Sequence, residues 1–209
     1  MIKEVLKTSE KELNYIVTTP SGESKNLPLV VFLHGAGERG SDLNNIKRHG
    51  LPKRLQYYEK MPAITLSPQC EEGKVWPTEI YRIKELIDKI VKEYEVDTSK
   101  IYLTGMSMGG FGTWAIACAF PDFFRAIAPV CGGGLAWNVG VIKHLPIHAF
   151  HGDIDDVVDP FYSINMVDKL RSLGSNAKLT ILKNVGHNCW DWVYEEYKII
   201  EKMIYEDEV

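Results

Sequence analysis

The sequence lacks long hydrophobic runs and clustered cysteines. Nowhere do about 18 apolar residues follow one another, as a transmembrane helix requires. Residues 1–7 lack the apolar core and the small-residue cleavage site of a signal peptide. The cysteines are scattered without C-x-x-C spacing, which is typical of reduced thiols; they are Cys70, Cys118, Cys131 and Cys189. A cytoplasmic protein is therefore predicted, and a secreted form that has lost its signal would show the same pattern.

Positive charge is not in excess either. The chain has 24 Lys and Arg against 28 Asp and Glu, which gives a formal net charge of −4, and no run of basic residues occurs. Binding to a phosphate backbone or to anionic lipid needs clustered positive charge. The composition therefore predicts neither nucleic acid nor a membrane surface as a partner, and it makes no prediction about oligomeric state.

What is present is an ordinary globular composition. The 209 residues are 45% hydrophobic and 25% charged, without a repeat, a low-complexity tract or a linker rich in proline and serine. A chain of this length can bury a core of its own and needs neither disulfides nor a structural metal. A single domain over residues 1–209 is predicted.

Short apolar runs alternate with longer segments of helical period. The predicted buried strands lie at 27–33, 63–66, 101–104, 126–130, 147–150 and 179–182, and the predicted helices at 80–91, 108–120, 160–173 and 189–204. This alternation indicates an α/β fold with a mainly parallel sheet and helices on both faces. Residues 14–18 predict an additional antiparallel strand at an edge. Functional sites of such sheets form at the carboxyl ends of the strands.

Ser107 lies at one of these strand ends, in the sequence Gly105-Met106-Ser107-Met108-Gly109. A serine in a tight strand-to-helix turn needs small neighbours, and the turn presents its hydroxyl at a helix N-terminus. Ser107 is the candidate nucleophile. The alternative is a serine that merely caps the helix that follows.

A serine hydroxyl needs a base, and the base needs an acid to orient it. His187 follows the last predicted strand and a flexible Gly186, which makes it the candidate base. The loop after the strand at 147–150 offers candidate acids: Asp153, Asp155, Asp156 and Asp159. This acidic loop lacks the regular spacing of a calcium-binding loop, and no metal is predicted.

The glycine-rich segment His34–Ser41 resembles two kinds of nucleotide-binding loop, a P-loop and a dinucleotide-binding loop. A P-loop is excluded because Ser41 stands where the phosphate-binding lysine is needed. A dinucleotide site through the GxGxxG at Gly35 to Gly40 needs a carboxylate at the end of the next strand, which ends in Gln69 instead. We favour a loop whose backbone N–H groups stabilise an oxyanion, with donors at Ala36 and Met108.

Together these segments resemble the α/β-hydrolase family, in which serine, acid and histidine follow in this order at strand ends. The resemblance covers residues 27–204 and is greatest to small single-domain serine esterases, in the phospholipase/carboxylesterase group and the feruloyl-esterase and polyhydroxybutyrate-depolymerase-like group. Their motif His-Gly-x-x-Asp-x-x-Val matches His151, Gly152, Asp155 and Val158. The resemblance therefore implies Asp155 as the acid and Ala36 as one oxyanion donor.

The segment between the strands at 126–130 and 147–150 is too short for the helical cap that larger relatives insert there. An open site without a large cap domain is therefore predicted. Trp76, Trp137 and Trp190 stand in or near loops on the same side and are candidates for an aromatic wall around an acyl or aryl group. The alternative is hydrophobic filling beneath those loops.

The predicted function is that of a cofactor-independent serine carboxylesterase. Its predicted partner is a small-molecule ester with a short acyl or an aryl, cinnamoyl-type group, and esters on sugars are included. Three alternatives stay open. They are a peptidase of the prolyl-oligopeptidase type, a nucleotide-dependent enzyme that uses the glycine loop, and a binding module without activity.

Overall fold

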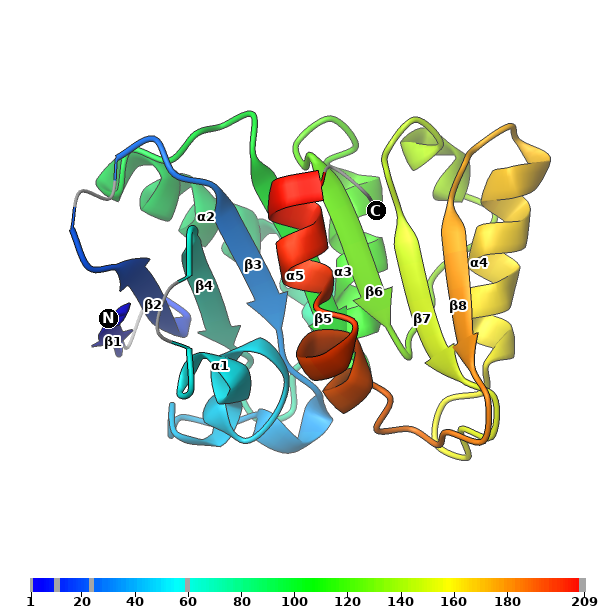
Figure 1. The fold of residues 1–209 in the computed structure, drawn as a ribbon, viewed down its shortest axis with the longest axis horizontal. Helices are drawn as coiled ribbons and strands as arrows, with labels where there is room; N and C mark the ends of the chain where they lie inside the picture. The colour runs from blue at the N-terminus through cyan, green and yellow to red at the C-terminus, as the bar shows by residue number, and fades with distance from the viewer. Residues whose placement is uncertain (1, 10–11, 23–24, 59–60, 207–209) are drawn as a thin grey trace.

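The fold is built on one sheet that runs through the whole molecule (Figure 1). The computed structural model describes residues 2–9, 12–22, 25–58 and 61–206; the ends of the predicted domain, at residue 1 and at 207–209, lie outside them. In chain order the strands are β1 Ile2–Lys7, β2 Asn14–Pro20, β3 Leu29–Leu33, β4 Ile64–Gln69, β5 Ile101–Met106, β6 Ala126–Val130, β7 His148–Gly152 and β8 Lys178–Leu182. Across the sheet their order is β1-β2-β4-β3-β5-β6-β7-β8.

The strands β3 to β8 run parallel, and β2 runs antiparallel to its neighbours β1 and β4. Every residue of β3, β5 and β6 is buried, because helices cover the sheet on both faces. Apolar side chains on both sides of a strand give a continuous hydrophobic run in the sequence, which is the pattern that predicted these strands. The predicted α/β architecture, a mainly parallel sheet with helices on both faces, is confirmed.

The antiparallel strand predicted at 14–18 is present as β2, but its predicted edge position is wrong. Strand β1 lies outside it and pairs with it from Ile2 opposite Pro20 to Lys7 opposite Tyr15. Most of β1 is exposed, and its lysines and glutamate protect the open edge from pairing with other chains. A strand that buries so little apolar surface has a weak hydrophobic pattern.

Two helical layers cover the sheet (Figure 1). The helices are α1 Gly50–Leu55, α2 Ile80–Glu93, α3 Met108–Ala119, α4 Phe161–Ser172 and α5 Ile199–Glu201. Helices α2, α3 and α4 pack on one face, around a core that includes Ile83, Trp114 and Val167. Helix α1 and the C-terminal segment pack on the other, around a core that includes Leu51 and Tyr194.

The C-terminal segment differs from the continuous helix predicted at 189–204. It consists of a π-helical turn, Trp192–Glu196, the short α5, and a second π-helical turn, Lys202–Glu206. Lys198 is left-handed between the first two, with φ 58°. Tyr194 and Ile199 are both fully buried, yet residues five apart on a regular α-helix point about 140° from one another. The irregular backbone turns both side chains toward the sheet.

The connection between β6 and β7 contains only a 3₁₀ turn, Val139–Ile142, so this connection holds no cap domain. The carboxyl ends of the parallel strands meet along one edge, the lower edge in Figure 1. Among the described residues, no helix combines the length and the apolar character needed to cross a bilayer. Ser107 and His187, which follow two of these strands, are both partly exposed to solvent.

Candidate active site

Ser107 occupies the sharp turn between β5 and α3. Its backbone is strained, with φ 54° and ψ −119°, and its N–H donates to the carbonyl of Val130 at 2.9 Å. The neighbouring glycines are required by close packing. A Cβ on Gly105 would lie 2.5 Å from the carbonyl oxygen of Gly109, and one on Gly109 would lie 1.9 Å from that of Leu33. The turn therefore exists only because these positions carry no side chain.

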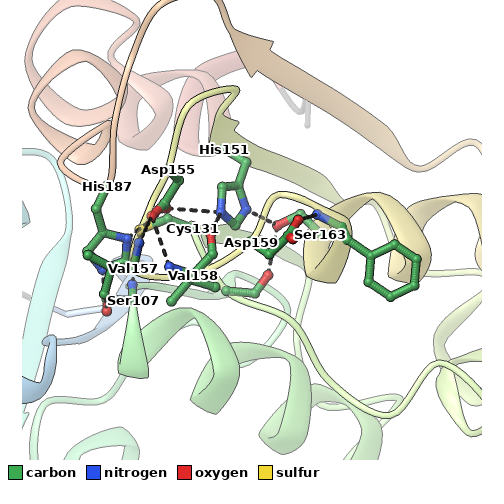
Figure 2. Close-up of polar contacts among 11 residues, drawn as sticks. Ser107, Cys131, His151, Asp155, Val157, Val158, Asp159, Ser163 and His187 are labelled. Atoms are coloured by element: carbon green, nitrogen blue, oxygen red, sulfur yellow. Dashed lines mark hydrogen bonds and ion pairs between the residues drawn. The ribbon is translucent and has the colours of Figure 1, made fainter.

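The structure brings Ser107 and His187 into contact (Figure 2). Nε2 of His187 lies 2.8 Å from Oγ of Ser107, and Nδ1 of the same ring lies 2.7 Å from Oδ2 of Asp155. An ionised carboxylate only accepts hydrogen bonds. Nδ1 of His187 therefore carries the hydrogen, which leaves Nε2 free to accept the proton of the serine hydroxyl.

Asp155 is held as a carboxylate by its surroundings. Its Oδ1 accepts the backbone N–H groups of Val157 and Val158, both at 2.9 Å. Burial alone would raise the pKa of Asp155, but the hydrogen bonds from Val158 and from His187 outweigh it and lower that pKa below its ordinary value of 3.8. By contrast, Asp153 and Asp156 are exposed. Of the candidate acids, the structure brings Asp155 to the histidine.

His151 is a member of this network that the sequence interpretation did not single out. Its Nε2 lies 3.1 Å from Oδ2 of Asp155 and 2.9 Å from the carbonyl oxygen of Val158, while Nδ1 lies 2.7 Å from Oγ of Ser163. Burial lowers the pKa of His151, against the opposing effect of these acceptors. The sequence feature that indicates His151 is its place in the motif His-Gly-x-x-Asp-x-x-Val, four residues before Asp155.

The glycine loop after β3 lies directly beside the serine. The point where a Cβ on Gly35 would stand is 3.7 Å from Cβ of Ser107. Ala36 begins a 3₁₀ turn, Ala36–Glu38, and Met108 begins α3. The first N–H groups of a helix have no acceptor within it. Both predicted oxyanion donors therefore stand at positions whose N–H groups are free of the helical hydrogen-bond pattern, and their role stays a prediction.

His34 and Trp76 hold this loop in place. The indole N–H of Trp76 donates to the carbonyl of His34 at 2.8 Å, and Nε2 of His34 accepts the N–H of Cys70 at 2.9 Å. Burial lowers the pKa of His34 to about 4, so the ring is neutral. The prediction that Trp76 forms part of a substrate wall is wrong, because its side chain is fully buried and presents no surface to a ligand.

The other two tryptophans are better placed than Trp76 to contact a substrate. Trp137 is 77% exposed on the β6–β7 connection. The ring of Trp190 meets the ring of His187 edge-on, with centroids 5.3 Å apart, and also contacts His49. Their contact with a substrate stays a prediction.

An apolar cavity of about 600 Å³ extends along α3, and Ser107, Asp155 and His187 are not among the residues that line it. Phe111 lines it and is one helical turn from Ser107, to whose carbonyl its N–H donates at 3.1 Å. No charged residue lines the cavity. The lining residues are Pro77, Ile80, Phe111, Trp114, Ala115, Cys118, Ala119, Gly133, Gly134, Leu135, Asn138, Tyr162 and Met166. The volume and the lining are those of a site for a small uncharged group.

Comparison with known proteins connects this geometry with chemistry. Residues 61–206 match the model of a family described as phospholipase/carboxylesterase. The chain is 30% identical over 135 residues to poly(3-hydroxyalkanoate) depolymerase C of Paucimonas lemoignei, an alignment that covers 60% of this chain and 33% of that protein. It is 30% identical over 174 residues to probable feruloyl esterase C of Aspergillus flavus, covering 77% of this chain and 60% of that protein. The chain thus spans less than two thirds of the length of these curated relatives.

A solved structure of a thermostable esterase has a similar fold. It superposes with a TM-score of 0.81 and 29% identity, and the match covers 98% of this chain and 62% of that one. The two folds therefore agree over almost the whole of this chain.

Proposed function

Because the chain belongs to the phospholipase/carboxylesterase family of α/β-hydrolases, we propose that it hydrolyses carboxylic esters through an acyl-enzyme formed on Ser107. The observation that carries the proposal is the continuous pair of hydrogen bonds from Ser107 through His187 to Asp155. A serine, a base and an orienting acid in this geometry form the machinery of acyl transfer.

In the first half of the reaction, His187 takes the proton of Ser107 while Oγ attacks the ester carbonyl. The tetrahedral intermediate collapses when the bond to the alcohol oxygen breaks, and His187 gives its proton to that oxygen. In the second half, His187 takes a proton from water, the resulting hydroxide attacks the acyl-enzyme, and the acid leaves as Ser107 regains its proton. Throughout, Asp155 stabilises the imidazolium and keeps Nδ1 protonated.

The oxyanion of each intermediate is stabilised by the N–H groups of Ala36 and Met108. Both come from rigid turns next to Ser107, so they need little reorganisation when the charge develops. Loss of one such donor costs about 10²- to 10³-fold in turnover in related chemistry. The partial positive charge at the N-terminus of α3 acts in the same direction.

The acyl group that we propose is apolar, either short or aryl of the cinnamoyl type. The cavity beside Phe111 carries no charged lining residue and is large enough for an aromatic ring with a short chain. The names of the relatives, a polyhydroxyalkanoate depolymerase and a feruloyl esterase, include both aliphatic and aryl esters. The short β6–β7 connection leaves the entrance open, which suits an ester with a bulky alcohol.

A peptidase and a nucleotide-dependent enzyme are the alternatives. The glycine loop that would bind a nucleotide carries the buried carboxyl of Glu38, which is unfavourable to a phosphate. An ester and an anilide of the same acid separate the esterase from the peptidase, because a peptidase cleaves the anilide as well as the ester, whereas an esterase leaves the anilide intact. Thermal stabilisation by a nicotinamide cofactor would support the nucleotide alternative.

The test of the proposal is the burst of p-nitrophenol from p-nitrophenyl acetate. The wild-type protein should show a burst equal to its active-site concentration, and Ser107→Ala should show none. A fluorophosphonate probe should label the wild type and the control Ser172→Ala, an exposed serine on α4, but not Ser107→Ala. A burst of full size in Ser107→Ala would exclude Ser107 as the nucleophile.

A further inference from the structure

A second histidine, His151, lies against the proposed acid, and the proposed reaction steps do not use it. Its Nε2 is 3.1 Å from Oδ2 of Asp155 and 2.9 Å from the carbonyl oxygen of Val158. The side chains of His151 and Asp155 are both completely buried. Figure 2 shows the ring between Asp155 on one side and Ser163 on the other. Because both groups are removed from water, the hydrogen bond between them is stronger than one at the surface.

The surroundings of His151 identify the ring nitrogen that carries the hydrogen. Both partners of Nε2, a carboxylate and a carbonyl, only accept hydrogen bonds, so a bare Nε2 would face two acceptors in a buried place. Nδ1 faces the hydroxyl of Ser163 at 2.7 Å, which can donate or accept and which also reaches the carbonyl of Gly132 at 2.7 Å. Nε2 therefore carries the hydrogen and donates it to Asp155 and Val158.

With this bond, the carboxylate of Asp155 uses all of its acceptor capacity. A carboxylate has about four lone-pair sites, two on each oxygen. Oδ1 accepts the N–H groups of Val157 and Val158, both at 2.9 Å. Oδ2 accepts the Nδ1 hydrogen of His187 at 2.7 Å and the Nε2 hydrogen of His151 at 3.1 Å. The two histidines therefore share one oxygen of the acid.

Sharing this oxygen connects His151 with the base. When His187 takes the proton of Ser107, the negative charge on Oδ2 stabilises the imidazolium. The N–H of His151 interacts with the same charge, so less of it is available to the imidazolium. The two backbone N–H groups on Oδ1 keep the carboxylate in its orientation with or without His151. The effect of His151 on the base is therefore electrostatic, and it favours the neutral imidazole of His187.

Other titratable groups also surround the acid and the base. Burial lowers the pKa of His151 and raises the pKa of the Cys131 thiol, whose Sγ accepts the N–H of Ser107 at 3.3 Å. Burial raises the pKa of Glu38 on the glycine loop as well, and α3 carries no charged residue. Wild type and variants share these groups, so a comparison between them isolates residue 151. The remaining titratable groups on the loops around the site are His49, Asp153, Asp156, Asp159, Cys189 and Asp191.

We propose that His151 acts through Asp155 as a positioning residue, and that its N–H on Oδ2 makes His187 easier to deprotonate and extends activity toward acidic pH. His151 touches neither the substrate nor the reacting atoms. The inference rests on the proposed function, because His187 is the base only if Ser107 is the nucleophile.

The experiment measures kcat/KM for p-nitrophenyl acetate against pH, since the acid limb of this profile reports the base of the free enzyme. In His151→Gln the amide nitrogen stands near the place of Nε2 and still donates to Asp155. In His151→Asn the shorter side chain reaches only the place of Nδ1, near Ser163. We expect the midpoint of the acid limb to move to higher pH by about half a unit to one unit in His151→Asn. His151→Gln should keep the wild-type midpoint.

The matched control is His148→Asn, at another buried histidine of β7. It stands three residues before His151, so its side chain points to the other face of the sheet. The midpoint should stay at the wild-type value in this variant, even if the protein is less stable. Thermal melts at each pH restrict the comparison to conditions in which every variant is folded.

A measurement on the wild type tests the inference without any variant. Nitrogen NMR of protein labelled at histidine should show the hydrogen of the neutral His151 ring on Nε2. A hydrogen on Nδ1 instead would overturn the inference, because Nε2 would then have nothing to donate to Asp155.

The inference is also wrong if the midpoint stays in place or moves to lower pH in His151→Asn, or if both variants of His151 shift it equally. A purely structural histidine would lower the melting temperature without moving the midpoint. Failure of the proposed function gives a different result, in which the wild type shows no burst and the fluorophosphonate probe does not label Ser107.

Discussion

Three aspartates in one short loop show how local contacts select a single residue. Asp155 is buried and accepts hydrogen bonds from two backbone N–H groups and from His187. Asp153 is exposed and accepts one long bond, 3.3 Å, from the N–H of Val185, and Asp156 is exposed. The difference lies in the backbone around the carboxylates and not in the residue type.

Replacing these aspartates one by one should therefore have unequal effects. We expect Asp155→Asn to lower kcat about 10³- to 10⁴-fold, because an amide next to His187 no longer fixes the tautomer with the proton on Nδ1. Asp153→Asn and Asp156→Asn are the matched controls and should stay within about threefold of the wild type. Steady-state kinetics on p-nitrophenyl acetate measures all three, and a larger loss in either control would move the acid to that residue.

At this scale the sequence identified residues whose role depends on order and spacing. Ser107, Asp155 and His187 belong to strand ends in a fixed chain order, and the structure brings them together. Trp76 could not be placed in the same way, because a loop position does not reveal whether a side chain points outward or under the loop.

The strand-to-helix turn is the element on which the site depends most. Gly109 packs against the backbone of β3, and a Cβ there would lie within 1.9 Å of a carbonyl oxygen that cannot move without disrupting the sheet. We expect Gly109→Ala to lower the free energy of unfolding by about 3 kcal/mol or more. Urea denaturation followed by circular dichroism measures the loss.

Gly37→Ala is the matched control for this change. Gly37 lies in the loop beside the site, but no atom comes within 4 Å of the position of a Cβ on it. Its replacement should change the free energy of unfolding by less than about 0.5 kcal/mol. If the two substitutions lowered the free energy of unfolding equally, the close contact with β3 would not be the reason why residue 109 must be glycine.

The elements that the sequence predicted well are those that bury apolar residues in a regular period. The parallel strands β3 to β7 and the helices α2, α3 and α4 belong to this class, whereas β8, which was also predicted as a buried strand, is only partly buried. The segment after Cys189 also buries many apolar residues, but π-helical turns and the left-handed Lys198 interrupt it. These irregularities allow the segment to pack against β5, where the hydroxyl of Tyr194 lies 2.8 Å from Oγ1 of Thr104. A contact between residues so far apart in the chain cannot be predicted from the local sequence.

The whole molecule should lose stability in mild acid because buried histidines must be charged. Burial lowers the pKa of His34 and of His148 to about 4, from an ordinary 6.5, and Lys178 and Lys202 act in the same direction on His148. The unfolded chain thus binds more protons than the native protein between about pH 6.5 and 4. The free energy of unfolding is therefore predicted to fall as the pH falls through this range. The raised pKa of Glu38 opposes part of the loss.

His148→Gln isolates one of these contributions. Glutamine keeps a hydrogen-bonding group near Thr180, to which Nε2 of His148 is 2.8 Å distant, but it does not titrate. Between pH 7 and pH 4 the variant should lose less stability than the wild type, by on the order of 2 kcal/mol. His144→Gln, at an exposed position, should behave as the wild type. A variant with an unchanged pH dependence would contradict the prediction for His148.

The strand order also has a consequence during biosynthesis. Strand β3, which precedes the glycine loop, lies between β4 and β5, which leave the ribosome after it. The proposed base, His187, follows β8, the last strand among the described residues. A nascent chain halted between residues 107 and 187 contains the proposed nucleophile but not the proposed base. The proposed hydrolysis therefore requires a chain that has been translated past β8, and shorter nascent chains should be inactive.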